Sequence, residues 1–281
     1  MNNYFFEDHW MIGVAPLKMS DVIKKGINFD KITIYNPSKK YYYADPFWHP
    51  QLDEGKLICE RFDFTTQHGS ISEIKIEDDK ITEEQTLLKE DWHLSFPFLI
   101  EHEGGLKMIP EASYNNESQV YPLESLDAKP FIKKALVDPV IYLHNETYWL
   151  FASIQNGKQN EELHLFWSDD FENWNNHSSS PICTNSFGAR MAGNIVSHEN
   201  ELFRFGQNCE KGYGKGIVIH KINELSKDQY SETAVGRIDA PANFSGIHTI
   251  NQFEDKVVFD LKKTYFSPLK PFRRLRRKLF S

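Results

Sequence analysis

The sequence predicts an all-β fold, a five-bladed β-propeller built by a single domain, on three observations. First, one unit recurs along the chain: a loop with a small or turn-forming residue, an apolar strand, a polar turn and a second apolar strand. Second, the five copies are spaced by about 40 to 55 residues, the range of a propeller blade. Third, aromatic residues make up 14% of the chain, which suits pleated and half-buried strands. A propeller places its site on the central axis, where the innermost strands converge.

The five copies follow one another along the chain. The first three begin near Tyr43, Leu94 and Val137, and each has a proline close to the start of its first strand. Proline fixes φ and withholds an amide, so it is tolerated at the start of a strand. Two weaker copies begin at Ala192 and Ser245. We expect a strand near the N-terminus to complete the last blade, which would close the ring and cover the sheet edges.

Helical signals are short. Residues 19–25 are expected to form a helix, since Ser20 can cap it, and residues 222–230 are expected to hold one or two helical turns. The rest of the chain alternates between strand and turn signals without an internal linker, so residues 1–266 are assigned to the propeller.

Composition narrows the class of partner. The formal net charge is −8, although residues 270–281 hold six basic residues and no acidic one. The remaining body is therefore strongly acidic, which argues against nucleic-acid binding as a main activity. The three cysteines lie far apart without metal-ligand spacing, so we expect a reducing compartment, no metal and no cofactor. The sequence shows no signal peptide and no apolar stretch of roughly 18 residues, which predicts a cytosolic protein.

The last segment, residues 267–281, is expected to form a basic amphipathic tail. Phe272, Leu275, Leu279 and Phe280 fall on one face of a helix, and basic residues occupy the other face. This pattern is typical of a helix that lies on an anionic membrane. The expected location is therefore peripheral, on the inner face of the cell membrane. The alternative is a solvated, disordered basic end.

Asp45 and Asp138 occupy equivalent places, each in an Asp-Pro pair immediately before an apolar strand. In a propeller both would open innermost strands and face the axial pocket. Two convergent carboxylates suit acid–base or charge-stabilising work at an anomeric carbon. The alternative is that both aspartates cap turns. Glu111, after the second strand of the second blade, is a third candidate catalytic carboxylate.

A pattern at Asp45-Pro46, residues 138–152 and residues 165–174 resembles glycoside hydrolase family 43, five-bladed propellers that cleave arabinosides and xylosides. The resemblance implies an inverting reaction, with Asp45 as the catalytic base and Asp138 as the residue that tunes its pKa. The family's general acid is a Glu in a Glu-Gly-Pro motif at the start of the fourth blade. This chain has Ala192-Gly193-Asn194 there, so ordinary hydrolysis by that scheme is not expected.

A second resemblance covers about residues 40–262. It rests on a set of short motifs, at residues 44–47, 93–98, 109–113, 190–194, 206–214 and 246–249. Together they resemble the propeller domain at the N-terminus of plant glucosamine inositolphosphorylceramide transferase, whose bacterial relatives are associated with surface-polysaccharide assembly. The resemblance implies a function related to glycans. It does not settle the chemistry, because a separate domain of the plant protein carries the recognised transferase fold.

If this family pattern holds, a group of polar side chains surrounds the axis and binds substrate. The candidates are His93, Arg190, Asn194, Gln207, Asn208, Tyr213 and His248. The planar fork of Arg190 suits a phosphate or carboxylate, so the ligand is expected to be a sugar with an anionic group, such as a sugar phosphate. The alternative for Gln207 and Asn208 is that they form hydrogen bonds that join blades.

The leading hypothesis is glycosyl transfer during assembly of a cell-surface polysaccharide, with a glycan or lipid-linked oligosaccharide as acceptor. In it, Asp45 activates the acceptor hydroxyl, Asp138 tunes Asp45 or stabilises charge on the sugar, and Arg190 holds an anionic group. A second hypothesis is a glycosidase related to family 43, in which Glu111 replaces the missing acid. A third is a non-catalytic glycan-binding module that assists a glycosyltransferase.

Overall fold

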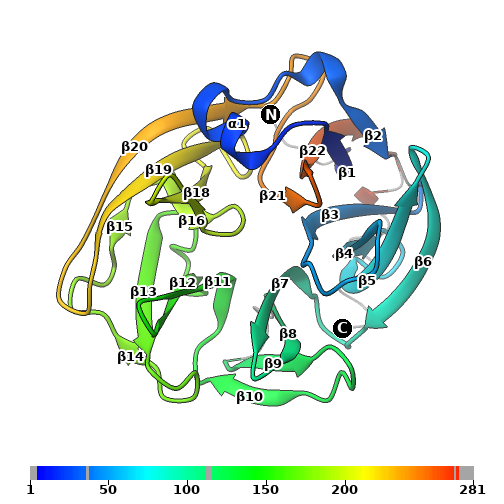
Figure 1. Ribbon diagram of the computed structural model, residues 1–281. Helices are drawn as coiled ribbons and strands as arrows, with labels where there is room; N and C mark the ends of the chain where they lie inside the picture. The colour runs from blue at the N-terminus through cyan, green and yellow to red at the C-terminus, as the bar shows by residue number, and fades with distance from the viewer. Residues whose placement is uncertain (1–4, 36–37, 112–115, 269, 272–281) are drawn as a thin grey trace.

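The computed structural model describes residues 5–35, 38–111, 116–268 and 270–271, which form five β-sheets arranged as a ring (Figure 1). Each sheet has four or five strands. The predicted five-bladed β-propeller is thereby confirmed. Residues 272–281 lie outside the described residues, so the amphipathic helix predicted there stays a prediction.

In blades 1 to 3 the strands run outward from the axis in chain order. Blade 1 consists of β3 (Tyr41–Phe47), β4 (Lys56–Asp63), β5 (His68–Glu77) and β6 (Lys80–Leu88). Blade 2 consists of β7 (Ser95–His102), β8 (Gly105–Glu111), β9 (Ser118–Pro122) and β10 (Lys129–Ile132). Blade 3 consists of β11 (Leu136–His144), β12 (Thr147–Ile154), β13 (Glu162–Ser168) and β14 (Asn175–Asn176), with β15 (Cys183–Thr184) also paired to β13.

Blade 5 combines the two ends of the described chain. Its strands are β21 (Ile250–Phe253), β22 (Lys256–Phe266), β1 (Phe6–Ala15) and β2 (Thr33–Tyr35). The pairing of β1 with β22 runs from Phe6 opposite Phe266 to Ala15 opposite Val257. This pairing confirms the predicted N-terminal closing strand and leaves no unpaired edge on β22.

Blade 4 consists of β16 (Phe187–Met191), β17 (Val196–His198), β18 (Glu201–Asn208), β19 (Gly216–Leu225) and β20 (Tyr230–Asp239). The innermost strands of blades 4 and 5 do not begin where the sequence predicted, because β16 ends before Ala192 and β21 starts after Ser245. Gly193 explains the first difference. Its φ is +142°, and a Cβ there would lie 2.0 Å from the carbonyl oxygen of Ile250, so this segment forms a tight connection rather than a strand.

The predicted helices had mixed outcomes. Helix α1 spans Met19–Lys25 as predicted, but Ser20 does not cap it, because the helix begins one residue earlier after Lys18. A short 3-10 helix, η1, covers Phe29–Lys31. The prediction of helical turns over residues 222–230 is wrong. That stretch is the hairpin between β19 and β20, where Leu225 pairs with Tyr230.

One backbone irregularity interrupts the innermost strand of three blades. It lies near the start of β7 and β11 but inside β3, so Asp45 does not precede its strand as the sequence predicted, because β3 already begins at Tyr41. Asp45, Phe96 and Asp138 have φ values of 48°, 45° and 48°, and each is followed by a proline. The strand pairing shifts register at each of these places. Positive φ is costly for residues other than glycine, and a bulge of this kind turns a side chain away from its regular direction. Asp45 and Asp138 are thus equivalent in backbone as well as in sequence.

The hydrophobic core lies between neighbouring sheets. One cluster of buried side chains extends from Phe47 in blade 1 to Ile222 in blade 4, and others link blades 4 and 5 and blades 5 and 1. Phe47 of blade 1 and Phe96 of blade 2 pack edge to face with ring centroids 4.8 Å apart, and this contact stabilises the interface between the two blades. No helix in the part of the chain that the structure describes has the length and apolar character needed to cross a membrane.

Candidate functional site

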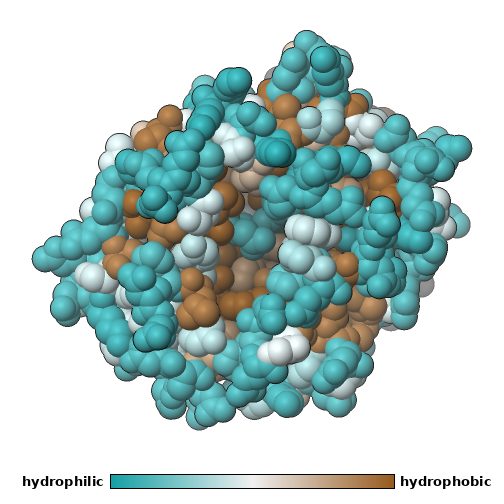
Figure 2. Space-filling model, viewed as in Figure 1, coloured by the Kyte–Doolittle hydropathy of each residue, from teal (hydrophilic) through white to brown (hydrophobic). Residues whose placement is uncertain are grey.

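The centre of the ring is the candidate site. Strands β3, β7, β11, β16 and β21 surround it in Figure 1, and Figure 2 shows a hollow in the molecular surface there. Side chains from different blades meet at this axis through hydrogen bonds and ion pairs, and they form two groups. One gathers around Asp45 in blade 1 and the other around Asp138 in blade 3.

Asp45 is 4% exposed and is held by contacts with two neighbouring blades. Its Oδ1 accepts a hydrogen bond from Thr249 Oγ1 at 2.6 Å, and its Oδ2 accepts one from the backbone N–H of Phe96 at 3.2 Å. Its own N–H donates to Oδ2 of Asp260 on β22 at 3.0 Å. The positive φ of Asp45 therefore places its carboxylate where blades 5 and 2 both reach it.

His248 joins Asp45 to Asp260. Its Nδ1 lies 2.6 Å from Asp260 Oδ2, and its Nε2 lies 3.7 Å from Asp45 Oδ1. The ring stacks on Trp10 of β1 with centroids 3.7 Å apart and planes 10° apart. The closing strand of the propeller thereby fixes the orientation of this imidazole.

Burial determines the protonation of this group. Burial raises the pKa of Asp45 to about 6, and the negative charges of Asp260 and Asp138 raise it further. The positive charge of His248 acts in the opposite direction and lowers this pKa. Burial alone would lower the pKa of His248, but the carboxylates of Asp260 and Asp45 outweigh it, so this pKa is raised. Asp45 can therefore change protonation state near neutral pH.

The second group is an ion-pair network. Arg190 Nε donates to Asp138 Oδ2 at 2.5 Å, and its Nη2 donates to Asp138 Oδ1 at 3.2 Å and to Glu111 Oε2 at 3.0 Å. Gln207 Nε2 donates to Asp138 Oδ2 at 2.7 Å. The ring of Tyr213 lies 4.9 Å from the guanidinium carbon. The planar guanidinium thus binds both carboxylates and fixes them relative to each other.

Burial and charge oppose each other at Asp138. Burial raises its pKa to about 7, although the adjacent guanidinium of Arg190 pulls in the other direction. Burial would lower the pKa of Arg190, but the carboxylate of Asp138 outweighs it, so Arg190 keeps its charge. The two aspartates therefore share a backbone conformation but have different charged partners.

The sequence reasoning missed Glu60, which is 4% exposed on β4. It lies opposite Ala44 in the β3–β4 pairing, just as Glu111 lies opposite Ser95 in the β7–β8 pairing. Its Oε1 lies 3.6 Å from His93 Nε2. Because Glu60 and Glu111 stand at matched positions in successive repeats, a comparison of the repeats in the sequence could have revealed Glu60.

The predicted substrate-binding residues divide into two sets. Arg190, Gln207, Tyr213 and His248 meet at the axis with the three predicted carboxylates. His93 faces Glu60 instead. Their roles in binding or catalysis stay predictions.

Asn194 and Asn208 are placed by other contacts. The Oδ1 of Asn208 accepts a hydrogen bond from the N–H of Glu210 at 3.1 Å, so this side chain braces the turn after β18. The backbone N–H of Asn194 donates to Asn251 Oδ1 at 2.9 Å, and Asn251 Nδ2 donates to the carbonyl of Pro46. Asn251, which sequence reasoning also missed, therefore ties blade 4 to blade 1.

Asp45, His248 and Asp260 also offer atoms of the types that bind metal ions, all within 4.8 Å of one another. Asp260 is already engaged, because its Oδ1 accepts hydrogen bonds from the N–H groups of His248 and Thr249 at 3.1 and 3.0 Å. Its Oδ2 faces Asp45 N and His248 Nδ1. These contacts give the carboxylate a structural role that needs no ion.

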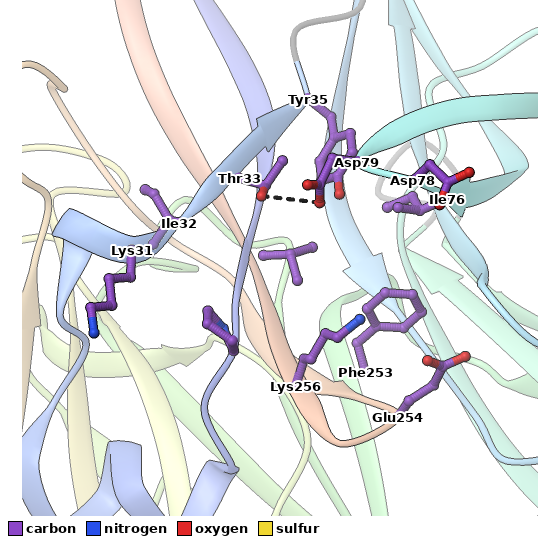
Figure 3. A pocket seen from close by; sticks show the side chains of 12 residues that line it. Lys31, Ile32, Thr33, Tyr35, Ile76, Asp78, Asp79, Phe253, Glu254 and Lys256 are labelled. Carbon is purple, nitrogen blue, oxygen red and sulfur yellow. Dashed lines mark hydrogen bonds between the residues drawn. The ribbon is translucent and has the colours of Figure 1, made fainter.

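A separate cavity of about 470 Å³ lies at the joint between blades 5 and 1 (Figure 3). Its lining includes Lys31, Lys256, Asp79 and Tyr35, and Thr33 Oγ1 donates to Asp79 Oδ1 at 3.3 Å. Burial and the charge of Asp79 raise the pKa of Tyr35 to about 12. None of the predicted site residues lines this cavity, so it is distinct from the axial site.

Solved structures with a similar fold include glycosidases. The catalytic domain of a GH62 α-L-arabinofuranosidase from Coprinopsis cinerea superposes with a TM-score of 0.56 and 9% identity, over 82% of this chain and 94% of that one. CoXyl43, a GH43 β-xylosidase/α-arabinofuranosidase from a compost microbial metagenome, gives a TM-score of 0.51 and 13% identity, over 82% and 92%. At such identities the likeness shows a shared fold alone.

Sequence comparison is more specific. Residues 32–248 match the family described as glucosamine inositolphosphorylceramide transferase 1, N-terminal. Glucosamine inositolphosphorylceramide transferase 1 of Arabidopsis thaliana is 36% identical over 207 residues, which is 69% of this chain and 27% of that protein. The protein of that name in Oryza sativa subsp. japonica is 34% identical over 260 residues, or 82% and 35%. This chain spans about a third or less of these relatives, and it belongs to the family of their N-terminal domain.

Proposed function

We propose that this protein is carbohydrate-active and takes part in the assembly of a cell-surface polysaccharide or sugar-bearing lipid, by glycosyl transfer at the propeller axis. One observation carries the proposal: two buried aspartates with the same backbone conformation face one axis in different electrostatic surroundings. Separate acid–base roles arise when the environments of paired carboxyl groups differ in this way. Membership in a family whose named relatives are transferases supports the same reading.

In this reaction Asp45 is the base. A pKa of about 6 lets its carboxylate accept the proton of an acceptor hydroxyl near neutral pH. The acceptor oxygen then bonds to the anomeric carbon of the donor sugar as the bond to the leaving group breaks. Asp138, oriented by Arg190 and Gln207, stabilises the positive charge that develops on the sugar ring.

The acceptor is proposed to be a glycan or a lipid-linked oligosaccharide. Tyr213 is 38% exposed above Arg190 and offers an aromatic face for a sugar ring. An anionic donor group could bind Arg190 only by competing with Glu111 or Asp138, because both already contact its guanidinium. A donor with no charge on its sugar therefore suits the site as well as an anionic one.

We also propose that the protein works on the inner face of the cell membrane. The support is the basic and apolar pattern of residues 270–281, in which each basic residue near an anionic surface contributes about 1 kcal/mol. Flotation with liposomes that contain anionic lipid tests this location. The full chain should float, and a chain with glutamate in place of Arg273, Arg274, Arg276 and Arg277 should not; equal flotation would refute it.

The test of the function is deletion of the gene, with composition and linkage analysis of the cell-surface glycans. The deletion is complemented by wild type, by Asp45→Asn, and by Asp239→Asn as a control at an exposed aspartate of β20. We expect one sugar residue to disappear and to return with wild type and the control, but not with Asp45→Asn. Unchanged glycans in the deletion strain would contradict the proposal and favour a glycosidase.

A glycan-binding module that presents the acceptor to a separate transferase is the second candidate. The observation in its favour is that the match covers 27% and 35% of the two named relatives, whose activity belongs to the whole protein. This candidate predicts that Asp45→Asn restores the missing sugar as well as wild type does. The same complementation therefore separates the two functions.

A further inference from the structure

Glu60 and Glu111 occupy the same place in successive blades. Each lies on the second strand, opposite the residue that precedes the positive-φ position: Ala44 for Glu60 and Ser95 for Glu111. Both side chains are almost fully buried, with exposed fractions of 4% and 7%. The repeat therefore directs two carboxyl groups toward the axis from equivalent backbone positions.

Their partners differ. Glu111 accepts a charge-assisted hydrogen bond from Arg190 at 3.0 Å. Glu60 faces His93, with 3.6 Å between its Oε1 and His93 Nε2, and this buried Oε1 has no hydrogen-bond partner among the described residues. A buried polar atom without a partner is costly and calls for an explanation, and a catalytic role is one.

His93 meets Glu60 with an N–H group rather than a charge. Its Nδ1 accepts a hydrogen bond from the backbone N–H of Gly69 at 2.9 Å, so the proton of the neutral ring resides on Nε2. Burial lowers the pKa of His93 to about 4, and His68 and Arg190 add to this shift. The ring therefore faces Glu60 as a neutral group and not as a cation, with its Nε2 3.6 Å from Oε1.

Gly69 makes room for this arrangement. A Cβ at this position would lie 2.6 Å from Glu60 Oε1 and 2.3 Å from the carbonyl oxygen of Leu94. Only glycine lets the carboxyl group of β4 and the imidazole before β7 approach each other across β5. The contact between Glu60 and His93 is thus built into the backbone.

The surrounding charges favour the protonated form of Glu60. Burial raises its pKa well above the usual range, and the charges of the four other axial carboxylates, Asp45, Glu111, Asp260 and Asp138, raise it further. Glu60 also raises the pKa of Tyr42, a neighbour on β3, after the larger effect of burial. Burial and these charges all favour the protonated form of Glu60, whereas the Glu111 carboxylate accepts a hydrogen bond from the Arg190 guanidinium.

We propose that Glu60 is a further catalytic residue, the proton donor to the leaving oxygen of a glycoside at the axis. This inference rests on the proposed glycosyl transfer. The bond between the anomeric carbon and the leaving oxygen breaks with its electron pair on that oxygen, which takes the proton of the Glu60 carboxyl group. The acceptor oxygen bonds to the anomeric carbon and its proton passes to Asp45. Exchange with solvent then returns a proton to Glu60 and removes one from Asp45.

The assignment also names the class of donor. An alkoxide is a poor leaving group and needs a proton, whereas a phosphate leaves without one. A dedicated acid therefore indicates a donor in which the sugar is linked to an alcohol, that is, an O-glycoside. In this assignment Glu60, on the second strand of blade 1, takes the place of the general acid that is missing from the start of blade 4.

Infrared spectroscopy of the full chain labelled with ¹³C-glutamate tests the protonation state, because the label separates glutamate from aspartate bands. At pH 7 we expect the C=O stretching band of a protonated glutamate in wild type and in Glu73→Gln, a control at a half-buried glutamate of β5. The band should vanish in Glu60→Gln. A wild-type spectrum without this band overturns the proposal, and this reading holds even if Glu60→Gln fails to fold.

Complementation of the deletion strain tests the role. A general acid accounts for about 10²- to 10⁴-fold in rate, so Glu60→Gln should restore less than about one hundredth of the wild-type transfer rate, while Glu73→Gln restores it fully. Full restoration by Glu60→Gln, with failure of Asp45→Asn, would overturn the role of Glu60 and leave the proposed function intact. Full restoration by both variants would overturn the proposed function itself. Thermal unfolding of each variant verifies that it is folded.

Discussion

On one side of the axis Asp45 and Glu60 face imidazoles, and on the other Asp138 and Glu111 face a guanidinium. The backbone of the two aspartates is the same, since Asp45 and Asp138 share a φ of 48° and a following proline. Glu60 and Glu111 lie at matched positions on the second strands of blades 1 and 2, whereas Ser153 occupies that position in blade 3. The glutamate beside Asp45 therefore comes from the same blade, and the one beside Asp138 comes from the neighbouring blade.

The difference lies in the partners that the other blades contribute. Arg190 comes from blade 4 and binds both carboxylates on its side, whereas His248 comes from blade 5 and bridges Asp45 to Asp260. A guanidinium is always charged, so its side of the axis is fixed electrostatically. Both aspartates have a raised pKa, about 6 for Asp45 and about 7 for Asp138, but of the two only Asp138 is bound by the guanidinium. Asp45 is therefore the carboxyl group better suited to exchange a proton with a substrate.

The largest expected effect on stability comes from removing the guanidinium of Arg190. Arg190→Met leaves Asp138 and Glu111 buried without their cation, which should lower the free energy of unfolding by about 3–5 kcal/mol at pH 7. Urea denaturation measures it. His248→Asn is the matched change on the other side and should cost less, because Asp260 keeps its backbone donors. Equal losses would contradict the contrast between the two sides.

The pH dependence of stability sharpens the comparison at Asp45. Its pKa is about 6 in the folded protein and 3.8 for an unperturbed aspartate, so folding takes up a proton at pH values between the two. This contribution to stability is present below about pH 4 and is lost as pH rises through 6. Relative to Asp45→Asn, wild type should lose up to about 3 kcal/mol between pH 4 and pH 7, since one pKa unit corresponds to about 1.4 kcal/mol. A constant difference between the two proteins across this range would contradict the assignment.

A smaller effect tests the shared backbone. At a φ of 48° asparagine is tolerated better than alanine, so Asp45→Ala should be less stable than Asp45→Asn by about 1–2 kcal/mol, and Asp138→Ala less stable than Asp138→Asn by a similar amount. Thermal or urea unfolding of the four variants measures both differences. If only one position showed a difference, the two sites would not be backbone equivalents.

The sequence was sufficient for the fold because the repeat is visible in it. Asp45 and Asp138 were found for the same reason, since Asp-Pro recurs at matched positions. Glu60 was missed although it stands at the same place in its blade as Glu111. Comparing the second strands of the repeats, rather than the first strands alone, would have found it.

Other site residues could not be read from the sequence. Asp260 and Thr249 reach Asp45 only because the ring closes and brings residues more than 200 positions apart into contact. Trp10 stacks on His248 for the same reason. The hairpin at residues 222–230 was mistaken for helical turns because its polar residues give no strand alternation, and the pairing of β19 with β20 decides its structure.

The most direct test of this account is a pH titration of the aspartate carboxyl carbons by ¹³C NMR in wild type, Asp45→Asn and Asp138→Asn. The account predicts that the resonance lost in Asp45→Asn titrates near pH 6 in wild type, well above the value of 3.8 for an unperturbed aspartate. It also predicts that this resonance keeps titrating in Asp138→Asn, because Asp45 has its own partners. An Asp45 resonance that titrates near pH 4 would contradict the central claim that the blade 1 side of the axis is prepared for proton transfer.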